Sequence, residues 1–172
     1  MAVDKDIAFH KQRTAEWEKY GIGTVRTNSM HEAITKLVHG DRFMFIVINE
    51  GSIPDFMAQL PIMRDVTNLP IFVFTNSYAI GKKIKAMDLG ADMYDWHNTY
   101  VKDDVLEALE ILKVQNRWSH RPLNALPVLV CGDIILSPLR HIVFVKDVKV
   151  RMVRQHQEYL GRKRSWSVTE PH

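Results

Sequence analysis

A polar residue stands at the end of a run of six apolar residues. Residues 43–48 read FMFIVI, and Asn49 follows them directly. A short unbroken apolar run is typical of a strand buried on both faces of a parallel sheet. Open α/β sheets place their sites at the carboxyl ends of such strands, and the following loop contains Gly51 and Pro54. Asn49 is therefore the first candidate functional residue.

Hydroxyl and imidazole groups occur near the same predicted edge, at Ser52, Thr75, Ser77 and His97. Hydrolysis by such a set needs a nucleophile in a G-x-S-x-G elbow and an acid that orients the imidazole. The sequence has no such elbow and places no acid beside His97, so an enzyme is the disfavoured class. The histidines show no H-x-H or H-E-x-x-H spacing, and the single Cys131 cannot form a C-x-x-C pair, so we expect no metal and no cofactor.

Strand and helix patterns alternate five times before Trp118. Strands are predicted at 1–4, 22–26, 43–48, 71–74 and 93–96. Helices are predicted at 7–20, after the capping box of Ser29 and Glu32, and at 55–66, 77–89 and 101–115. This alternation predicts a flavodoxin-like fold, a five-stranded parallel sheet with helices on both faces.

The helix at 77–89 has a distinct pattern of apolar and basic residues. Ile80, Ile84 and Met87 recur at helical spacing and are predicted to face the sheet. The basic residues of the same helix, predicted to face solvent, are Lys82, Lys83 and Lys85.

The pattern changes after Trp118, so residues 1–118 are predicted to form the first domain. Residues 119–127 contain two prolines and are predicted to be a linker. Short apolar pieces at 128–130, 134–136, 141–145 and 148–150 predict a small antiparallel β-meander, followed by a short helix at 151–160 and a flexible basic tail at 161–172. A meander of this size makes a poor core alone, so we expect it to pack on the first domain or on a second subunit.

The charge is distributed unevenly along the chain. Up to Trp118 there are 14 Lys and Arg against 16 Asp and Glu, and from Ser119 onward there are 9 against 4. A basic cluster of this kind binds nucleic acid phosphates or is an ordinary solvated surface. The candidate DNA contacts are Lys149, Arg151, Arg154, Arg162, Lys163 and Arg164. No apolar run is long enough to cross a bilayer and no signal peptide is visible, so a cytoplasmic location without membrane contact is expected.

Several of these segments resemble a known family. IVIN-E-GSIPD, PIFVFT and KAMDLGADMY, within residues 1–118, resemble the receiver domain of two-component response regulators. GDIILSPLRHIVFVKDVKV is similar to the β-platform that opens the winged-helix effector domain of OmpR/PhoB-type regulators. A complete winged helix needs roughly 50 further residues after Val150, including the recognition helix, so residues 128–160 are expected to be a truncated version.

The resemblance implies a phosphorylation site that this sequence does not keep. The family phosphorylates an Asp at the end of a strand, with help from a metal-binding acidic pair, a hydroxyl and a lysine. The matching positions are Asn49 for the phosphoacceptor, Asp4 and Lys5 for the acidic pair, Thr75 for the hydroxyl, His97 for the lysine and Tyr94 for the aromatic switch. A neutral amide cannot form an acyl phosphate, so a degenerate, non-phosphorylatable receiver is expected.

Lys5 has two interpretations in this setting. Its ammonium could take the place of the metal ion and pair with Asp4, Asp6 or Glu50, because a buried cation needs a partner. The alternative is that the side chain points into solvent.

The family also dimerises through salt bridges on one face. The candidate residues for such a dimer face are Lys82, Lys83, Lys85, Asp92, Asp95, Asp103 and Glu107, and a solvated face is the alternative. The expected function is a phosphorylation-independent response regulator that acts as a homodimer and regulates transcription through DNA. The alternative is a pseudo-receiver that docks on another signalling protein without binding DNA.

Overall fold

The computed structural model describes residues 1–53, 55–96, 127–150, 152–154 and 166–168. Five parallel strands form a sheet in the order β2-β1-β3-β4-β5. The strands are β1 (Ala2–Val3), β2 (Arg26–Thr27), β3 (Ile46–Asn49), β4 (Ile71–Thr75) and β5 (Met93–Trp96). This is the flavodoxin-like order, so the predicted fold class is confirmed.

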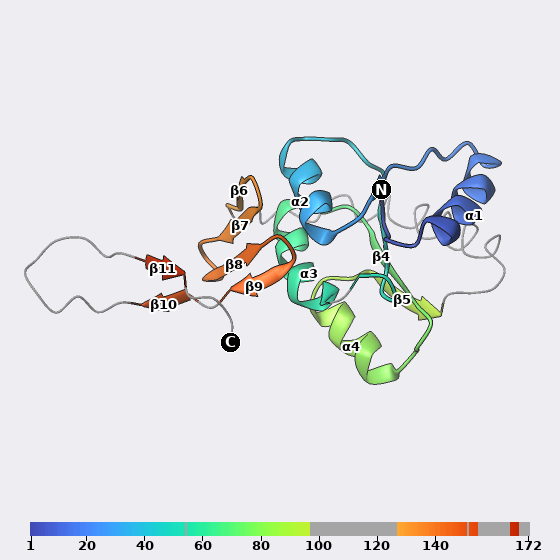
Figure 1. Cartoon of the computed structure of the whole chain (residues 1–172). Helices are drawn as coiled ribbons and strands as arrows, with labels where there is room; N and C mark the ends of the chain where they lie inside the picture. The colour runs from blue at the N-terminus through green and yellow to red at the C-terminus, as the bar shows by residue number, and fades with distance from the viewer. Residues whose placement is uncertain (54, 97–126, 151, 155–165, 169–172) are drawn as a thin grey trace, which may run out of the picture.

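Helices cover both faces of the sheet, as Figure 1 shows. Helix α1 (Ile7–Glu18) packs Trp17 on one face, against Phe45, Phe72 and Phe74. Helices α2 (Met30–Val38), α3 (Phe56–Val66) and α4 (Ile80–Asp88) lie on the other face, where the larger core is. Alternate residues of β3 and β4 point into the two cores, which is why both strands are apolar up to their last residues, Asn49 and Thr75.

A local sequence signal sets the start of α2. The Ser29 side chain accepts a hydrogen bond from the Glu32 backbone N–H at 3.0 Å. The Glu32 carboxylate in turn accepts from the Asn28 backbone N–H at 2.9 Å. The Ser29 half of the predicted capping box is therefore present, while Glu32 reaches one residue beyond the N-cap, and Ser29 fixes where this helix begins.

The predicted orientation of α4 is wrong. Ile80, Ile84 and Met87 are 64%, 57% and 41% exposed, and the helix buries only Ala86. The helix is rotated so that the small Ala86 side chain packs in the core and Lys82 reaches Glu50.

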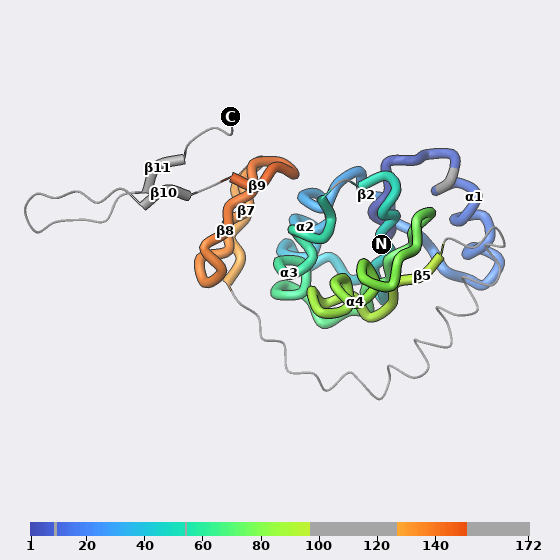
Figure 2. Tube along the Cα trace, turned by 90° about the horizontal axis from the view of Figure 1, so that it is seen from below, coloured from blue at the N-terminus to red at the C-terminus, as the bar shows by residue number. Residues whose placement is uncertain are grey.

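The predicted meander is a four-stranded antiparallel sheet of order β6-β7-β8-β9. Its strands are β6 (Leu129–Cys131), β7 (Ile134–Ser137), β8 (Ile142–Val145) and β9 (Val148–Val150). It lies beside α2 and α3, as Figure 2 shows from below, and Ile135 and Phe144 join the core of the first domain. Of the two expected partners of the meander, the first domain and a second subunit, the structure shows packing on the first domain.

Polar contacts reinforce this packing. The Arg140 guanidinium binds both carboxylate oxygens of Asp65 in α3, at 2.5 and 2.7 Å. The Asp147 carboxylate accepts from the His31 backbone N–H at 3.1 Å, and the His31 ring contacts the Gly132 carbonyl oxygen at 2.9 Å. These contacts join residues more than 70 positions apart, and they fix the C-terminal sheet on α2 and α3.

Residues 152–154 do not begin a helix as predicted. Strand β10 (Met152–Arg154) pairs antiparallel with β11 (Trp166–Val168), which also places a strand inside the predicted flexible tail. Val and Trp side chains favour a paired strand over a short isolated helix. The predicted helix at 101–115 and nearly all of the predicted linker lie outside the described residues. Of the helices that are described, none is both long and apolar enough to span a membrane.

Candidate functional site

The carboxyl ends of β1 and β3 bring Asp4 and Asn49 together. The Asn49 Nδ2 donates to Asp4 Oδ1 at 3.1 Å, and both side chains are buried. The Asn49 Oδ1 accepts from the Gly51 backbone N–H at 3.2 Å. The amide is therefore held on both sides, and it offers no nucleophile at the position where the sequence predicts the degenerate phosphoacceptor.

Asp4 is satisfied by donors from the protein itself. Besides the Asn49 amide, Asp4 Oδ1 accepts from Ser52 Oγ at 2.7 Å and from the Asp6 backbone N–H at 2.8 Å. Mg²⁺ is usually held by one or two carboxylates, and at this edge Asp4 Oδ1 is filled by protein donors while both Glu50 oxygens are bound by Lys82 and Tyr94. Within the described part of the chain, no group of three or more His, Cys, Asp or Glu side chains could hold a metal ion. The residues present do not fit a magnesium site.

Lys5 does not take the place of a metal ion. Its side chain is exposed, and it forms no ion pair with any described acidic residue. The Lys5 backbone N–H donates to Ser52 Oγ at 3.0 Å, and the Arg26 guanidinium binds the Asp4 and Lys5 carbonyl oxygens at 2.9 Å each. These contacts hold the backbone so that the side chain points into solvent. The predicted pairing of Lys5 with Asp4, Asp6 or Glu50 is wrong.

A different lysine supplies the cation. Lys82 Nζ lies 2.8 Å from Glu50 Oε1, and the Tyr94 hydroxyl donates to Glu50 Oε2 at 2.6 Å. Burial opposes ionisation of Glu50, but hydrogen bonds from Lys82, Thr75 and Tyr94 outweigh it and hold the pKa of this carboxyl below its usual value. Burial and the hydrogen bond to Glu50 raise the pKa of Tyr94 to about 12. The result is an ionised carboxylate clamped between an ammonium and a neutral phenol.

Sequence reasoning singled out Tyr94 and Thr75 but did not connect them with Glu50 and Lys82. Thr75 ends β4, where its Oγ1 accepts from the Ser77 backbone N–H at 2.9 Å, and Tyr94 is buried in the neighbouring strand β5. One signal was available, because Glu50 directly follows Asn49 and so had to lie at the same edge. For Lys82 on α4, the sequence contained no comparable indication that it would bind Glu50. His97, the other predicted site residue, lies outside the described residues.

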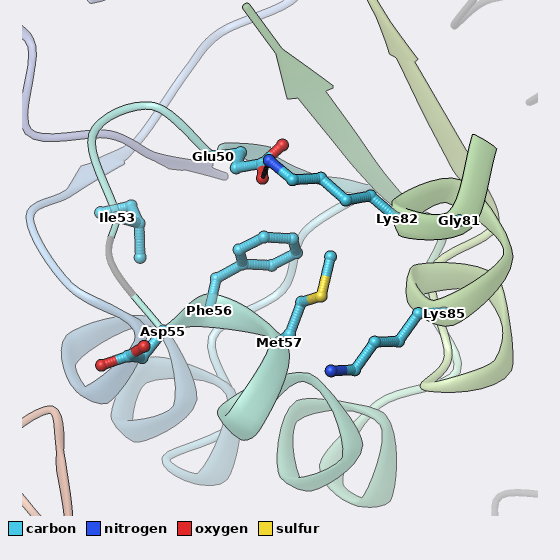
Figure 3. Close-up of a pocket in the computed structure, with 8 residues that line it drawn as sticks. All are labelled: Glu50, Ile53, Asp55, Phe56, Met57, Gly81, Lys82 and Lys85. Carbon is cyan, nitrogen blue, oxygen red and sulfur yellow. Dashed lines mark hydrogen bonds and ion pairs between the residues drawn. The ribbon is translucent and has the colours of Figure 1, made fainter. Parts of the chain in front are cut away.

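A pocket of about 530 Å³ opens beside Glu50, between α3 and α4 (Figure 3). Phe56 and Met57 of α3 form an apolar wall, and Lys82 extends along the pocket to Glu50. Lys85 points across toward Met57. The full lining is Glu50, Ile53, Asp55, Phe56, Met57, Gly81, Lys82 and Lys85.

Several residues of the predicted dimer face are engaged inside the molecule. Asp92 is mostly buried and accepts from Arg64 at 2.6 Å and from the Ile71 backbone N–H at 2.9 Å. Asp95 accepts from the Trp96 backbone N–H, and Lys82 is held by Glu50. Asp103 and Glu107 lie outside the described residues.

The two remaining lysines of the predicted face are not in salt bridges with described acids. Lys83 Nζ lies 5.8 Å from the centre of the Tyr78 ring, and Lys85 is exposed. The surface around them is partly apolar, since Ile80 and Ile84 are exposed on the same helix.

The candidate DNA contacts fall partly within the described chain. Lys149 is exposed on β9, and Arg154 belongs to β10. Arg151, Arg162, Lys163 and Arg164 lie outside the described residues.

Comparison with known proteins gives structural relatives only. No protein-family model matches the chain, and no curated protein matches it in sequence. A CheY-like response regulator receiver domain from Methanospirillum hungatei JF-1 matches with a TM-score of 0.61 at 17% identity, over 69% of this chain and 95% of that one. A Burkholderia pseudomallei response regulator, solved with a phosphorylated aspartic acid, matches with a TM-score of 0.55 at 22% identity, over 75% of each chain.

A third structural relative is a dimer. The beryllofluoride-activated NtrC4 receiver domain dimer matches with a TM-score of 0.57 at 18% identity, over 64% of this chain and 92% of that one. The first domain of this chain thus has the receiver fold of response regulators.

Proposed function

We propose that this protein is an atypical response regulator of the OmpR/PhoB type that signals without phosphorylation. The observation that carries the proposal is the site at the ends of β1 and β3, where Asn49 replaces a nucleophile and donates to Asp4. Asp4 Oδ1 also accepts two further protein donors, so its hydrogen bonds are supplied by the protein without a metal ion.

The position of Tyr94 supports a single fixed signalling state. Its ring is buried and its hydroxyl is bound to Glu50, which Lys82 neutralises. Lys82, in the first turn of α4, thus binds Glu50 after β3, and Glu50 in turn binds Tyr94 of β5. A surface of this kind stays constant without a covalent signal, so its output depends on how much protein is present and on which partners bind.

Transcription regulation through DNA is the favoured output. The basic excess after Ser119, 9 Lys and Arg against 4 Asp and Glu, supports contact with a phosphate backbone. The test is an electrophoretic shift with duplex DNA over a series of salt concentrations. Binding that weakens steeply with salt is expected, and Lys149→Ala should reduce that salt dependence, whereas Lys36→Ala on α2 should not.

A second candidate function is a docking module that binds another protein or itself. The observation that favours it is the firm packing of the C-terminal sheet on α2 and α3 through the Arg140–Asp65 pair. Absence of any DNA shift at low salt would exclude the transcription regulator and leave this candidate. For both candidate functions we propose a homodimer. Asp92 and Lys82 are not its contacts, because Asp92 is bound by Arg64 and Lys82 by Glu50 within the same chain.

A further inference from the structure

The pocket between α3 and α4 lies outside the hydrogen bonds that join Asp4 to Asn49. Its volume of about 530 Å³ is typical of small-molecule sites, which measure about 300–1,000 Å³. Figure 3 shows the hollow with α3 on one side, α4 on the other and Glu50 at one end. A concave space of this size suits a small molecule rather than a protein surface.

The α3 side of the pocket is apolar. Ile53 and Phe56 are only 2% and 3% exposed, so they form its floor. Met57 is partly buried, and its side chain extends from α3 toward α4 (Figure 3). An occupant that fills this side therefore needs an apolar body.

The α4 side of the pocket is cationic. Lys82 and Lys85 lie one helical turn apart and share a face of α4. Glu50 neutralises Lys82 at 2.8 Å, whereas Lys85 is exposed and forms no ion pair with any acidic residue that the structure describes. Asp55, the other acid of the lining, is exposed, and its carboxylate points away from Lys85 (Figure 3). Lys85 is thus the charge that an occupant of the pocket can neutralise.

We propose that this pocket binds a small organic monoanion, a carboxylate with an aromatic or short aliphatic body. The body packs on Phe56 and Met57, and the carboxylate lies beside the Lys85 ammonium. Charge complementarity selects this class, because Lys85 repels a cation and adds nothing to the binding of a neutral molecule. The inference goes beyond the proposed function and does not depend on it, since that function rests on Asp4 and Asn49, neither of which lines the pocket.

Titration of the full chain with phenylacetate and phenylacetamide tests the ligand class, because the two probes differ in charge and hardly in shape. Binding is followed by nuclear magnetic resonance of isotope-labelled methionine methyl groups. Met57→Leu identifies the Met57 signal, and the signal of Met87, which is exposed on α4 outside the pocket, serves as the reference. Ligands of this size bind with dissociation constants on the order of 1 mM.

We expect phenylacetate to shift the Met57 signal and not the Met87 signal. Phenylacetamide should bind about two- to fivefold more weakly, the range of an exposed ion pair. Equal affinities would overturn the anionic class. A Met57 signal that phenylacetate leaves in place, at concentrations well above its expected dissociation constant, would overturn the site itself.

Two matched variants locate the carboxylate. Lys85→Gln removes the charge at the pocket, whereas Lys83→Gln removes the same charge from a neighbour whose ammonium lies 5.8 Å from the Tyr78 ring and does not line the pocket. Neither lysine is buried, so both variants should fold. The difference in affinity between the two probes should shrink in Lys85→Gln and persist in Lys83→Gln. An undiminished difference in Lys85→Gln would refute the assigned place of the carboxylate.

Phenylalanine, which adds an ammonium to the same body, separates a monoanion from a zwitterion. It should bind no more tightly than phenylacetate, because Asp55 points away from the pocket centre. Tighter binding that Asp55→Asn abolishes would overturn the monoanion in favour of a zwitterion.

Discussion

Removal of one hydroxyl tests the clamp around Glu50. In Tyr94→Phe the buried ring stays, but Glu50 loses the donor that lies 2.6 Å from its Oε2. A hydrogen bond to a charged group contributes about 1.5–3 kcal/mol to stability. Because the Glu50 side chain is 15% exposed, water can replace part of that bond. We expect the free energy of unfolding to fall by about 1–2 kcal/mol.

The assay is urea unfolding followed by tryptophan fluorescence, with Tyr78→Phe as the matched control. Tyr78 stacks on Trp96 with ring centres 6.4 Å apart, and its phenol forms no hydrogen bond with a described residue, so its loss should cost less than about 0.5 kcal/mol. An equal, near-zero effect of both variants would refute the claim that the phenol holds Glu50 in place.

The same bond predicts a response to alkaline pH. The pKa of Tyr94 is raised from 10.0 to about 12 in the folded protein. Between these two values the folded state keeps a proton that the unfolded state has lost, so stability falls as pH rises through this window. This part of the pH dependence should be absent in Tyr94→Phe.

Three further outcomes follow from the contacts of individual side chains. Arg140→Ala leaves the buried Asp65 carboxylate, 5% exposed, without its bidentate partner; we expect a loss of about 2–3 kcal/mol in urea unfolding, and a smaller loss when Asp65→Asn is added. Because the pKa of Glu50 is lowered on folding, its contribution is complete above the usual value of 4.5 and disappears as pH falls below it; Glu50→Gln should flatten stability in that acid range, and an unchanged acid profile would contradict this. Lys5→Ala should leave the melting temperature unchanged, since the ammonium is exposed, and a clear decrease would restore a structural role for it.

The sequence predicted the sheet better than it predicted the surface of α4. The central strands β3 and β4 are apolar runs whose burial is decided by composition, and the alternation of strands and helices with right-handed crossovers favoured the flavodoxin-like order that is observed. The side of α4 that faces the sheet carries Ala86, and the helix orientation brings Lys82 to Glu50, which is 32 positions away in the chain. Helical periodicity of Ile80, Ile84 and Met87 carries no information about such a contact, and it indicated the wrong face.

The candidate site was predictable in its position and less so in its contacts. Asn49, Asp4 and Thr75 stand at strand ends and were named from that fact. Of the two interpretations of Lys5, the one in which its side chain points into solvent was correct. Arg26 and Ser52 bind the Lys5 backbone and so decide the direction of its side chain. The small size of the meander predicted that it packs on another part of the protein. It did not predict which residues of α2 and α3 the C-terminal sheet contacts.

The most direct test of the site formed by Asp4 and Asn49 is the intact mass of the protein after incubation with acetyl phosphate and magnesium. A phosphorylatable receiver domain treated in parallel shows that the reagent is active. We predict an unchanged mass for this chain, because Asn49 offers no carboxylate and Asp4 is occupied by three protein donors. A stable adduct of one phosphoryl group that maps to the carboxyl edge of the parallel sheet would contradict the account.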